Sequence, residues 1–282
     1  MNPGINSRRR PRILIDIPIL NEIEHIERLV RGVTHALRGY DYLLLIVDGG
    51  STDGTWEYLE RAIAEQPGRV ALLEKKKVLR GCQRGAALLA GLKWGLQNGN
   101  FDIFVEMDGD LSHRPEELPA GIETIARGAA DIAVISKYAP GSRIVGRSAH
   151  RRIISRINSF AARIAIRWHL RDFSNGYRFY NRAAAELPAR YAIRYGSPIY
   201  LTEVMAIWMK HGLKVVEIPG HYIGRDEGLS KVRLVDYIKT ALGVMEIAIR
   251  FHFTGFRPIA GSPAIDSRQK AASASAVRPL DG

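Results

Sequence analysis

The sequence contains little cysteine and no long apolar run. Its single cysteine, Cys82, excludes an internal disulfide framework and any metal site built from several cysteines. No uncharged apolar stretch reaches the roughly 18 residues that a membrane-spanning helix needs. The basic start at residues 8–10 leads into a short strand interrupted by Asp16 and Pro18, which is not the pattern of a secretory signal. We therefore expect a protein that is made and kept in the cytoplasm.

Metal-binding histidine patterns are also missing, as are aromatic residues interleaved with basic ones. The eight histidines show no metal-ligand spacing. Few aromatic residues alternate with the basic stretches, which makes nucleic acid an unlikely partner. Positive charge is in excess, because 41 lysines and arginines face 29 acidic residues and the formal net charge is +12. This excess favours an anionic partner such as nucleotide phosphates or lipid head groups.

The length and composition suit one large α/β domain. The chain has 282 residues and a hydrophobic content of 46%, which is enough for an ample core. Residues 1–11 are polar and basic and contain proline, which predicts a disordered arm. Residues 254–282 are rich in alanine and serine with scattered prolines, which predicts a disordered tail. The folded domain is therefore expected over residues 12–253, with amphipathic helices at its end.

Short β-rich segments alternate with helix-like segments along the first half of the chain. The predicted strands cover residues 12–17, 42–47, 70–73, 103–107 and 131–135. The predicted helices cover residues 22–37, 55–64, 83–97 and 115–127. This alternation predicts an α/β fold with a mostly parallel central sheet and helices on both faces. Because ligands of such sheets bind at the carboxyl ends of the strands, the loops there are the candidate site.

Two aspartates one residue apart follow the fourth predicted strand. Asp108 and Asp110 can both turn towards one hard cation, and Gly109 between them lets the backbone bend. Mg²⁺ or Mn²⁺ prefers oxygen ligands and keeps water and substrate phosphates in its coordination shell. The alternative is a solvated turn that caps the next helix. The position after a buried strand, opposite two other polar loops, favours a site for a metal ion and a diphosphate.

A glycine-rich turn follows the second predicted strand. Asp48 can accept hydrogen bonds from a base or a ribose, and Gly49 and Gly50 permit the close approach of a ligand. The alternative is a plain turn in which Thr52 or Asp53 caps the next helix.

Several sequence motifs carry a resemblance to a known family. They are Ile-Pro-Ile-Leu-Asn-Glu at 17–22, Val-Asp-Gly-Gly-Ser-Thr-Asp-Gly-Thr at 47–55 and Met-Asp-Gly-Asp-Leu-Ser-His at 107–113. Together they resemble the inverting GT-A glycosyltransferases of family 2. The later motifs at 136–138, 175–180 and 225–231 are similar to those of polyprenyl-phosphate and dolichyl-phosphate mannose synthases. The resemblance covers about residues 12–250 in the same order.

The resemblance implies a GT-A fold and an inverting transfer of a hexose, with mannose as the preferred sugar. The donor would be GDP-mannose or another GDP- or UDP-hexose, and the acceptor a polyprenyl monophosphate. Asp48 would contact the nucleotide base. The other residues implied on the donor side are Pro18, Asn21 and Glu22 around the base, Asp108 and Gly109 beside the diphosphate, and Asp108, Asp110 and Ser112 on a Mg²⁺ or Mn²⁺ ion.

The resemblance also implies a set of residues around the phosphates and the acceptor. Arg225, together with Ser230 and Lys231, would lie on a loop that grips the diphosphate or the acceptor phosphate. Glu203 would lie near the acceptor. The chain departs from the family pattern at Gly49, at Lys137 and at Ser112 or Leu201, so the nucleotide and the acceptor stay open at this point. The remaining implied acceptor contacts are Lys137, Arg151 and Ser155.

Two basic or apolar segments in the second half have helical periodicity. In residues 147–168 a basic stripe lies beside an apolar face made of Ile153, Ile157, Phe160, Ile164 and Trp168. Such a helix fits either a membrane surface or a protein core with a solvated basic face. Arg151 and Ser155 share one face of it and could meet one phosphate. Residues 234–253 form a second apolar segment, which fits the membrane interface or an integral-membrane partner protein.

The sequence thus predicts a metal-dependent hexosyltransferase attached peripherally to the inner face of a membrane. One alternative is a family 2 transferase that acts on a soluble or polysaccharide hydroxyl, with Glu203 as the general base. A more remote alternative is a nucleotide- or nucleic-acid-binding module without catalysis.

Overall fold

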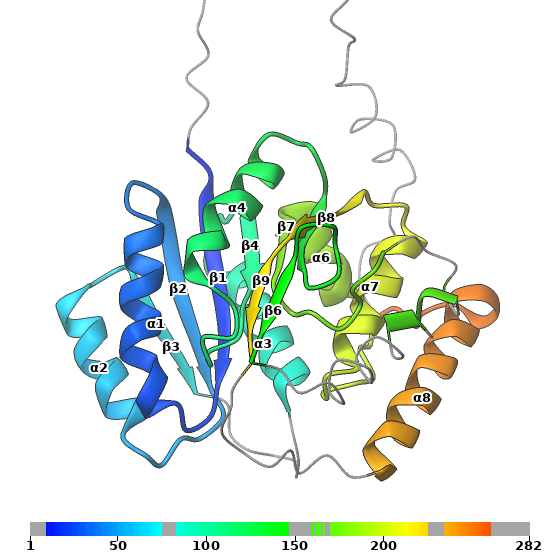
Figure 1. Cartoon of the computed structure of the whole chain (residues 1–282), viewed down its shortest axis with the longest axis horizontal. Coiled ribbons are helices and arrows are strands. Elements are labelled where there is room, and N and C mark those ends of the chain that lie inside the picture. Colours follow the sequence, from blue (N-terminus) through cyan, green and yellow to red (C-terminus); the bar gives the residue numbers. More distant parts are fainter. Residues whose placement is uncertain are drawn as a thin grey trace, which may run out of the picture.

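The structure is a computed structural model that describes residues 10–74, 83–146, 159–160, 162–164, 166, 170–224 and 234–260. A seven-stranded sheet lies at its centre, with helices on both faces (Figure 1). The strands run in the order β3-β2-β1-β4-β7-β5-β8. Their bounds are β1 Arg12–Ile19, β2 Asp41–Asp48, β3 Val70–Glu74, β4 Ile103–Glu106, β5 Ile132–Ser136, β7 Arg178–Asn181 and β8 Val215–Pro219.

The sheet is mostly parallel, as the sequence predicts. Strand β1 pairs in parallel with both β2 and β4, and only β7 runs antiparallel to its two neighbours. Both faces of β1 and β2 are buried, which explains why their sequences are nearly continuous apolar runs. The five predicted strands and four predicted helices all occur within a few residues of the predicted bounds. Strands β7 and β8 were not predicted.

Two hydrophobic clusters fill the space between the sheet and its two helical layers. One face is covered by α1 (Ile23–Ala36), α2 (Thr55–Glu65) and α4 (Leu118–Ala126), the last preceded by the 3₁₀ turn η1 (Pro115–Glu117). The other face is covered by α3 (Arg84–Asn98), α6 (Arg182–Arg190), α7 (Tyr200–Lys210) and α8 (Leu234–Ile249), which continues into the π-helical turn η2 (Arg250–Thr254). A small second sheet pairs β6 (Arg143–Val145) with β9 (His221–Ile223).

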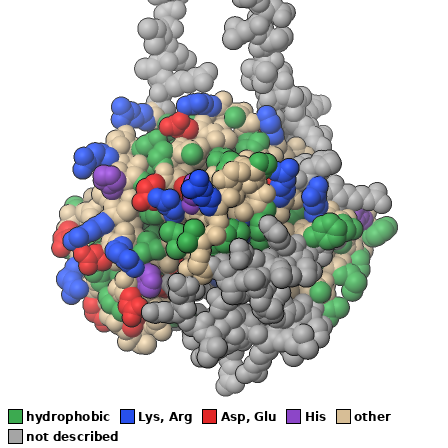
Figure 2. All heavy atoms as spheres, in the orientation of Figure 1, with side chains coloured by type: hydrophobic (Ala, Val, Ile, Leu, Met, Phe, Trp, Pro, Cys, Tyr) green, Lys and Arg blue, Asp and Glu red, His purple; other side chains and the backbone are tan. Residues whose placement is uncertain are grey.

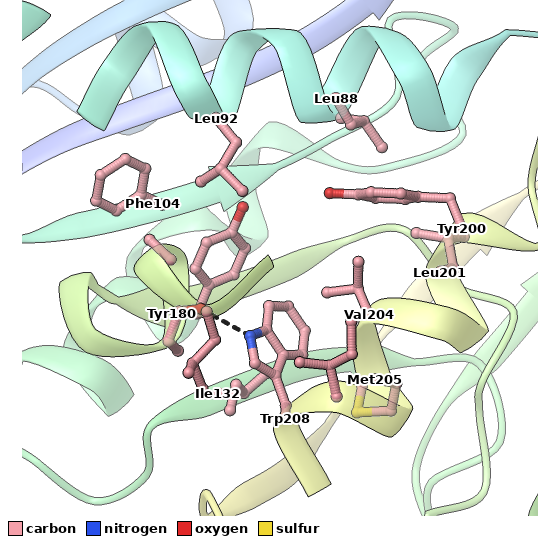
Figure 3. Close-up of a cluster of buried hydrophobic side chains, with 14 of the residues drawn as sticks. Leu88, Leu92, Phe104, Ile132, Tyr180, Tyr200, Leu201, Val204, Met205 and Trp208 are labelled. Atoms are coloured by element: carbon pink, nitrogen blue, oxygen red, sulfur yellow. Dashed lines mark hydrogen bonds between the residues drawn. The ribbon is translucent and has the colours of Figure 1, made fainter. Parts of the chain in front are cut away.

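Aromatic residues hold α7 against the sheet (Figure 3). Tyr180 of β7 stacks on Phe104 of β4, with ring centroids 6.0 Å apart, and lies 5.0 Å from the Trp208 ring. The indole nitrogen of Trp208 donates a 2.7 Å hydrogen bond to the carbonyl of Ala184 in α6, so its one polar atom is satisfied in the core. This packing fixes α7, and with it Tyr200 and Glu203, beneath the strand ends.

The folded domain begins near its predicted start at residue 12 but extends beyond its predicted end at residue 253. Residues 1–9 and 261–282 lie outside the described residues. The described chain continues past the predicted end at residue 253. Tyr191 forms a β-bridge with Pro258, and the Ile259 amide donates to the Arg190 carbonyl. The first residues assigned to a disordered tail are therefore paired with the domain.

The predicted amphipathic helix over residues 147–168 is described only in its second half. There the buried side chains are Ser159, Ala162 and Ile166, whereas Phe160 and Ile164 are 61% and 62% exposed. These two belong to the apolar face that the sequence predicts. That face therefore points outward at these two positions, and the described part of the helix packs on the core through Ser159, Ala162 and Ile166.

Candidate active site

Three strand-end loops meet at one edge of the sheet, as expected. Strand β1 lies between β2 and β4, and all three run in the same direction. The loops that follow them begin at Leu20, Gly49 and Met107. Topology alone thus brings together the base-binding and metal-binding residues implied by the resemblance.

The first two loops are locked to each other by hydrogen bonds. The Asn21 side chain accepts from the Thr52 amide at 2.9 Å, and the Asn21 amide donates to the Ser51 hydroxyl at 2.8 Å. The Glu22 amide donates to the Thr55 hydroxyl at 3.0 Å. Asn21 has a φ of 57°, a left-handed conformation that costs energy for a residue other than glycine. A strained residue held by its neighbours at a strand end is a mark of a binding loop.

Asp48 is fully buried and organises its own turn. Its carboxylate accepts a 2.7 Å hydrogen bond from the Ser51 hydroxyl and further bonds from the amides of Gly50 and Ser51. Pro18, which the resemblance also assigns to the donor side, pairs with Val47 next to this turn. The proposed contact between Asp48 and a nucleotide base stays a prediction. The structure adds that Asp48 also shapes the turn that would receive the base.

The loop with the aspartate pair lies tightly against β1. A methyl group at Gly109 would come within 2.7 Å of the Ile19 side chain, so glycine is needed for this close approach. The Asp110 carboxylate accepts from the Ser112 amide at 3.0 Å. Leu111 between them has a φ of 60°, a second strained residue in the site. The loop is therefore held in one shape that places Asp108 and Asp110 next to the β1 and β2 loops.

His113 supports this loop and is fully occupied in doing so. Its Nδ1 atom accepts from the Asp108 amide at 3.0 Å, so its Nε2 atom carries the proton and donates to the Asn175 side chain at 2.8 Å. Burial lowers the pKa of the His113 imidazole, which keeps the ring neutral. The motif that contains Asn175 is thereby connected to the aspartate pair.

Arg84, at the start of α3, contacts Asp108 and could not be identified from the sequence. Its Nη2 atom lies 2.5 Å from Asp108 Oδ1. Helix α3 begins immediately after a segment outside the described residues, and nothing in its local pattern distinguishes Arg84 from a surface arginine. Only the packing of α3 against β1 brings it to Asp108.

Ser112 and Lys137 are buried on the other side of the aspartate loop. Ser112 is 2% exposed and, with His113 and Lys137, lines a small cavity with room for about one water molecule. The Lys137 ammonium is 3.3 Å from the Ser174 hydroxyl and 3.5 Å from Asp172 Oδ2. The proposed roles of Ser112 on the metal and of Lys137 on the acceptor phosphate stay predictions.

Glu203 is fully buried and has a complete set of structural partners. It accepts hydrogen bonds from the amides of Arg194 and Tyr195, at 3.0 Å each, and from the Arg250 guanidinium at 2.6 Å. These contacts join α7 to the segment before it and to η2. Such an environment is that of a structural anchor, and it differs from that of a base open to a substrate hydroxyl.

Five residues implied by the resemblance lie outside the described residues: Arg151, Ser155, Arg225, Ser230 and Lys231. Their proposed contacts with phosphates stay predictions.

A row of buried charged residues runs beneath the site. Asp16, Glu106 and Arg178 are paired across β1, β4 and β7, and all three are at most 3% exposed. Glu106 accepts hydrogen bonds from the hydroxyls of Tyr180 and Tyr200, at 3.3 and 3.1 Å. Both oxygens of Asp16 have no hydrogen-bond partner in the described chain. Burial, reinforced by the nearby Glu106, raises the pKa of Asp16 well above its usual range.

The residues present fit a divalent cation that shares its shell with a substrate. No group of three or more histidine, cysteine or acidic side chains that could hold a metal occurs within the described residues. Asp108 and Asp110 offer two carboxylates at a constrained loop. Mg²⁺ and Mn²⁺ are commonly held by one or two carboxylates together with substrate phosphates, so two protein ligands suffice.

Comparison with known proteins decides the family. A model described as glycosyl transferase family 2 matches residues 15–187, a span that includes all three strand-end loops. The chain belongs to glycosyltransferase family 2. The expectation drawn from the loop motifs is confirmed.

Two curated family members are similar over most of the chain. The polyprenol monophosphomannose synthase of Mycolicibacterium smegmatis is 32% identical over 245 residues, which cover 86% of this chain and 89% of that protein. The undecaprenyl-phosphate mannosyltransferase of Micrococcus luteus is 34% identical over 224 residues, which cover 78% of this chain and 87% of that protein. The narrower resemblance to polyprenyl-phosphate mannose synthases is therefore confirmed.

A solved structure shares the fold. Glucosyl-3-phosphoglycerate synthase of Mycobacterium tuberculosis, crystallised with Mn²⁺, uridine diphosphate and glucosyl-3-phosphoglycerate, matches with a TM-score of 0.57 at 17% identity. The match covers 90% of this chain and 83% of that one. At this identity the likeness concerns the fold, and it confirms the expected GT-A architecture.

Proposed function

We propose that this family 2 glycosyltransferase moves mannose from GDP-mannose to a polyprenyl monophosphate, with inversion at the anomeric carbon. The observation that carries the proposal is the meeting of Asp108 and Asp110 with the interlocked β1 and β2 loops. This constellation lies in a chain similar over most of its length to two enzymes that mannosylate polyprenyl phosphates.

The structure of Glu203 favours a phosphate acceptor over a hydroxyl acceptor. A hydroxyl nucleophile needs a general base, and Glu203 is the acidic residue that the sequence offers for this task. Its carboxylate is already bound to two backbone amides and to Arg250. A phosphate monoester carries about −1.5 to −2 charges at neutral pH and attacks without such a base. The residues of the site then have to orient the two substrates and to stabilise the departing diphosphate.

Asp108 and Asp110 would hold a Mg²⁺ or Mn²⁺ ion. When bound, such an ion supplies positive charge that stabilises the leaving diphosphate. Support for the metal comes from the donor set of the aspartate loop and from the Mn²⁺ found with the structurally similar synthase. Asp48 and Asn21 would position the nucleotide, and Arg225, Ser230 and Lys231 would grip phosphate oxygens.

The outward face of α8 supports attachment to a membrane surface. The inner face of the helix is anchored by Val244 and Ile247, which are at most 6% exposed. Figure 2 shows hydrophobic side chains gathered on the edge of the molecule where Figure 1 places α8. Among the described residues, no helix is long and apolar enough to cross a bilayer. The outward apolar side chains of α8 and η2, 46–83% exposed, are Leu242, Met245, Ile249 and Phe253.

This face, which we name the apolar stripe, suits the surface of an anionic membrane. An amphipathic helix binds there through buried apolar area together with electrostatic attraction to acidic lipids, and the chain carries a net charge of +12. The proposed acceptor has a polyprenyl tail, which resides in such a membrane. We therefore place the protein peripherally on the membrane face that exposes the phosphate of the acceptor. There the candidate active site can reach its substrate.

A lipid-labelling assay tests the proposed function. The purified full chain is incubated with vesicles that contain polyprenyl phosphate and with a panel of labelled GDP- and UDP-hexoses. We expect label from GDP-mannose in the lipid extract. The matched control contains the same polyprenol without its phosphate, and it should stay unlabelled. Label in the free polyprenol would favour a hydroxyl acceptor. Absence of label from every donor would favour a binding module without catalysis.

A further inference from the structure

The Asp108 carboxylate already has a cation beside it. Arg84 Nη2 lies 2.5 Å from Asp108 Oδ1, and the other carboxylate oxygen is 3.5 Å from His113 Nε2. The Nδ1 atom of His113 accepts from the Asp108 amide, so the ring proton lies on Nε2 and is directed to the Asn175 side chain. Arg84 is therefore the positive charge in contact with Asp108 within the described chain, in the region that a divalent ion bound to Asp108 would occupy.

Little besides this charge holds Arg84 in place. Its Nε and Nη2 atoms are buried, yet neither donates a hydrogen bond with good geometry in the described chain. A buried donor without an acceptor is unfavourable, so the guanidinium gains by moving once Asp108 is neutralised in another way. Helix α3 itself stays anchored by Leu88 and Leu92 in the core, so the side chain can move without the helix.

Gly176 provides the space that Arg84 occupies. The three atoms nearest to a methyl group placed at Gly176 all belong to the Arg84 guanidinium, and the nearest is in direct collision. The end of a flexible side chain can move aside at low cost, whereas backbone cannot. An alanine at position 176 would therefore displace Arg84 from Asp108 and leave the surrounding fold unchanged.

We propose that Arg84 is a built-in counter-ion that competes with the divalent cation for Asp108. It neutralises the strand-end carboxylate while no metal is bound, and it must leave Asp108 Oδ1 before a metal ion can bind there. This inference deepens the proposed function, since it rests on the metal site assigned to Asp108 and Asp110. It makes metal affinity in the absence of donor lower than two well-placed aspartates would provide.

Metal binding without donor or acceptor tests the proposal. The free Mn²⁺ in a titration of the full chain is followed by electron paramagnetic resonance. Loss of a charge-assisted contact from the metal-free state should tighten Mn²⁺ binding in Arg84→Met by about ten- to a hundredfold. Gly176→Ala should tighten it in the same direction. Arg31→Met, which removes a 78% exposed arginine from α1, is the matched charge control and should leave affinity within about twofold.

Several outcomes would overturn the inference. The inference is wrong if Mn²⁺ binding is unchanged or weaker in both Arg84→Met and Gly176→Ala. It is also wrong if none of the proteins binds Mn²⁺. If Arg84→Met does not fold, Gly176→Ala decides the question alone. The gain should vanish when Asp108→Asn is added, and a gain that persists would place the competition elsewhere. If the unmodified chain labels lipid but the variants bind Mn²⁺ with unchanged affinity, this inference is wrong and the proposed function is still supported.

Discussion

Asp16 is a charged residue in the middle of an otherwise apolar strand. Gly91 of α3 lies directly against its carboxylate, and a side chain at that position would collide with the carboxylate oxygens. Neither oxygen has a hydrogen-bond partner in the described chain. Burial and the neighbouring Glu106 both disfavour the ionised form, which raises the pKa of Asp16. Ionisation of Asp16 is therefore less favourable in the folded protein than in the unfolded chain.

The buried Asp16 carboxyl leads us to predict how the stability of the protein depends on pH. A carboxyl group with a raised pKa in the folded state contributes stability that is fully present below its unfolded pKa of about 3.9. That contribution is lost as the pH rises through the folded pKa. Asp16→Asn removes the ionisation, so its stability advantage over the unmodified chain should grow from acidic to neutral pH. The difference in melting temperature between Asp16→Asn and the unmodified chain should therefore increase in favour of the variant as the pH rises.

Thermal melts at several pH values measure this difference. Asp41→Asn, at the exposed start of β2, is the matched control and should show no such growth. A variant Asp16→Asn that is equally or less stable than the unmodified chain at every pH would contradict the burial of an unpaired carboxylate.

Asp110 allows a prediction about the metal. Chelation with EDTA should abolish transfer of label to lipid, because the aspartate pair alone does not neutralise a departing diphosphate. Asp110→Asn should lower turnover by orders of magnitude while the melting temperature changes by only a few degrees, since the side chain is partly exposed. The assay is initial rate against polyprenyl phosphate in parallel with a thermal melt. Full activity in EDTA would rule out the two-aspartate metal site.

At the scale of secondary-structure elements, α8 combines a firm anchor with an unpartnered apolar face. Arg250 in η2 binds the buried Glu203, and Glu246 binds Arg194 at 2.7 Å and the Tyr195 hydroxyl at 2.6 Å. Burial, together with this hydrogen bond to Glu246, raises the pKa of Tyr195 to about 12, so this hydroxyl donates at any physiological pH. The helix is thus held rigidly with its apolar stripe directed outward.

The apolar stripe predicts binding to lipid. The full chain should float with vesicles that contain acidic lipid, and Met245→Ser combined with Phe253→Ser should release most of it into the soluble fraction. Burial of two large apolar side chains contributes about 3–6 kcal/mol, so their loss should be visible even if basic residues keep part of the affinity. Val145→Ser, at a position 62% exposed in β6, is the matched control.

Unchanged flotation of the double variant would contradict a membrane role for the stripe. If the unmodified chain fails to float and instead requires membranes that retain their proteins, an integral-membrane partner would take the place of the lipid.

The link between α7 and η2 predicts a structural effect at Glu203. Removal of one member of a buried ion pair destabilises a protein by about 3–5 kcal/mol. Glu203→Gln should therefore lower the melting temperature by roughly 6 °C or more. The folded variant should keep substantial transfer to polyprenyl phosphate at low temperature, because the acceptor needs no general base. Arg250→Met is the matched variant, and it should lower the melting temperature to a similar extent.

The opposite effect of Glu203→Gln on stability and activity would support a hydroxyl acceptor. If Glu203→Gln keeps its melting temperature and loses all transfer, the carboxylate takes part in the chemistry.

At the scale of the whole molecule, the proposed substrate contacts divide into a donor set and an acceptor set. The donor loops follow β1, β2 and β4, whereas the proposed acceptor contacts come from Lys137 after β5 and from Arg151 and Ser155. Arg151→Ala should weaken use of the acceptor by roughly ten- to a hundredfold, since a hydrogen bond to a charged group contributes about 1.5–3 kcal/mol. Donor binding should stay within about twofold.

Two titrations on Arg151→Ala separate the two sides. They are binding of GDP-mannose by calorimetry and initial rate against polyprenyl phosphate. Equal damage to both would mean that Arg151 serves the diphosphate or the fold. Absence of damage to either would leave the basic segment as a solvated surface.

The order of strands and helices and the clustering of three loops could be predicted from the sequence. Apolar runs and helical periodicity depend on near neighbours in the chain, and the parallel order of β1, β2 and β4 places their carboxyl ends together. Asp48, Asp108 and Asp110 were therefore identifiable before any contact was known. The antiparallel strand β7 (Arg178–Asn181) was not predicted, because its buried first residue, Arg178, is charged and interrupts the apolar pattern expected of a buried strand.

Contacts between residues far apart in the chain were decided only by the tertiary structure. Arg84 meets Asp108 because α3 packs across β1, and Glu203 meets Arg250 across 47 residues. Helical periodicity identified Leu242, Met245, Ile249 and Phe253 as one apolar face, but it could not say whether that face meets the core or the surface. Val244 and Ile247 lie inward, and Glu246 and Arg250 bind groups beside the core at the same end of the helix. The sequence by itself determined which three strand-end loops lie together, whereas the packing of distant elements decided which charges are paired and which apolar face stays open.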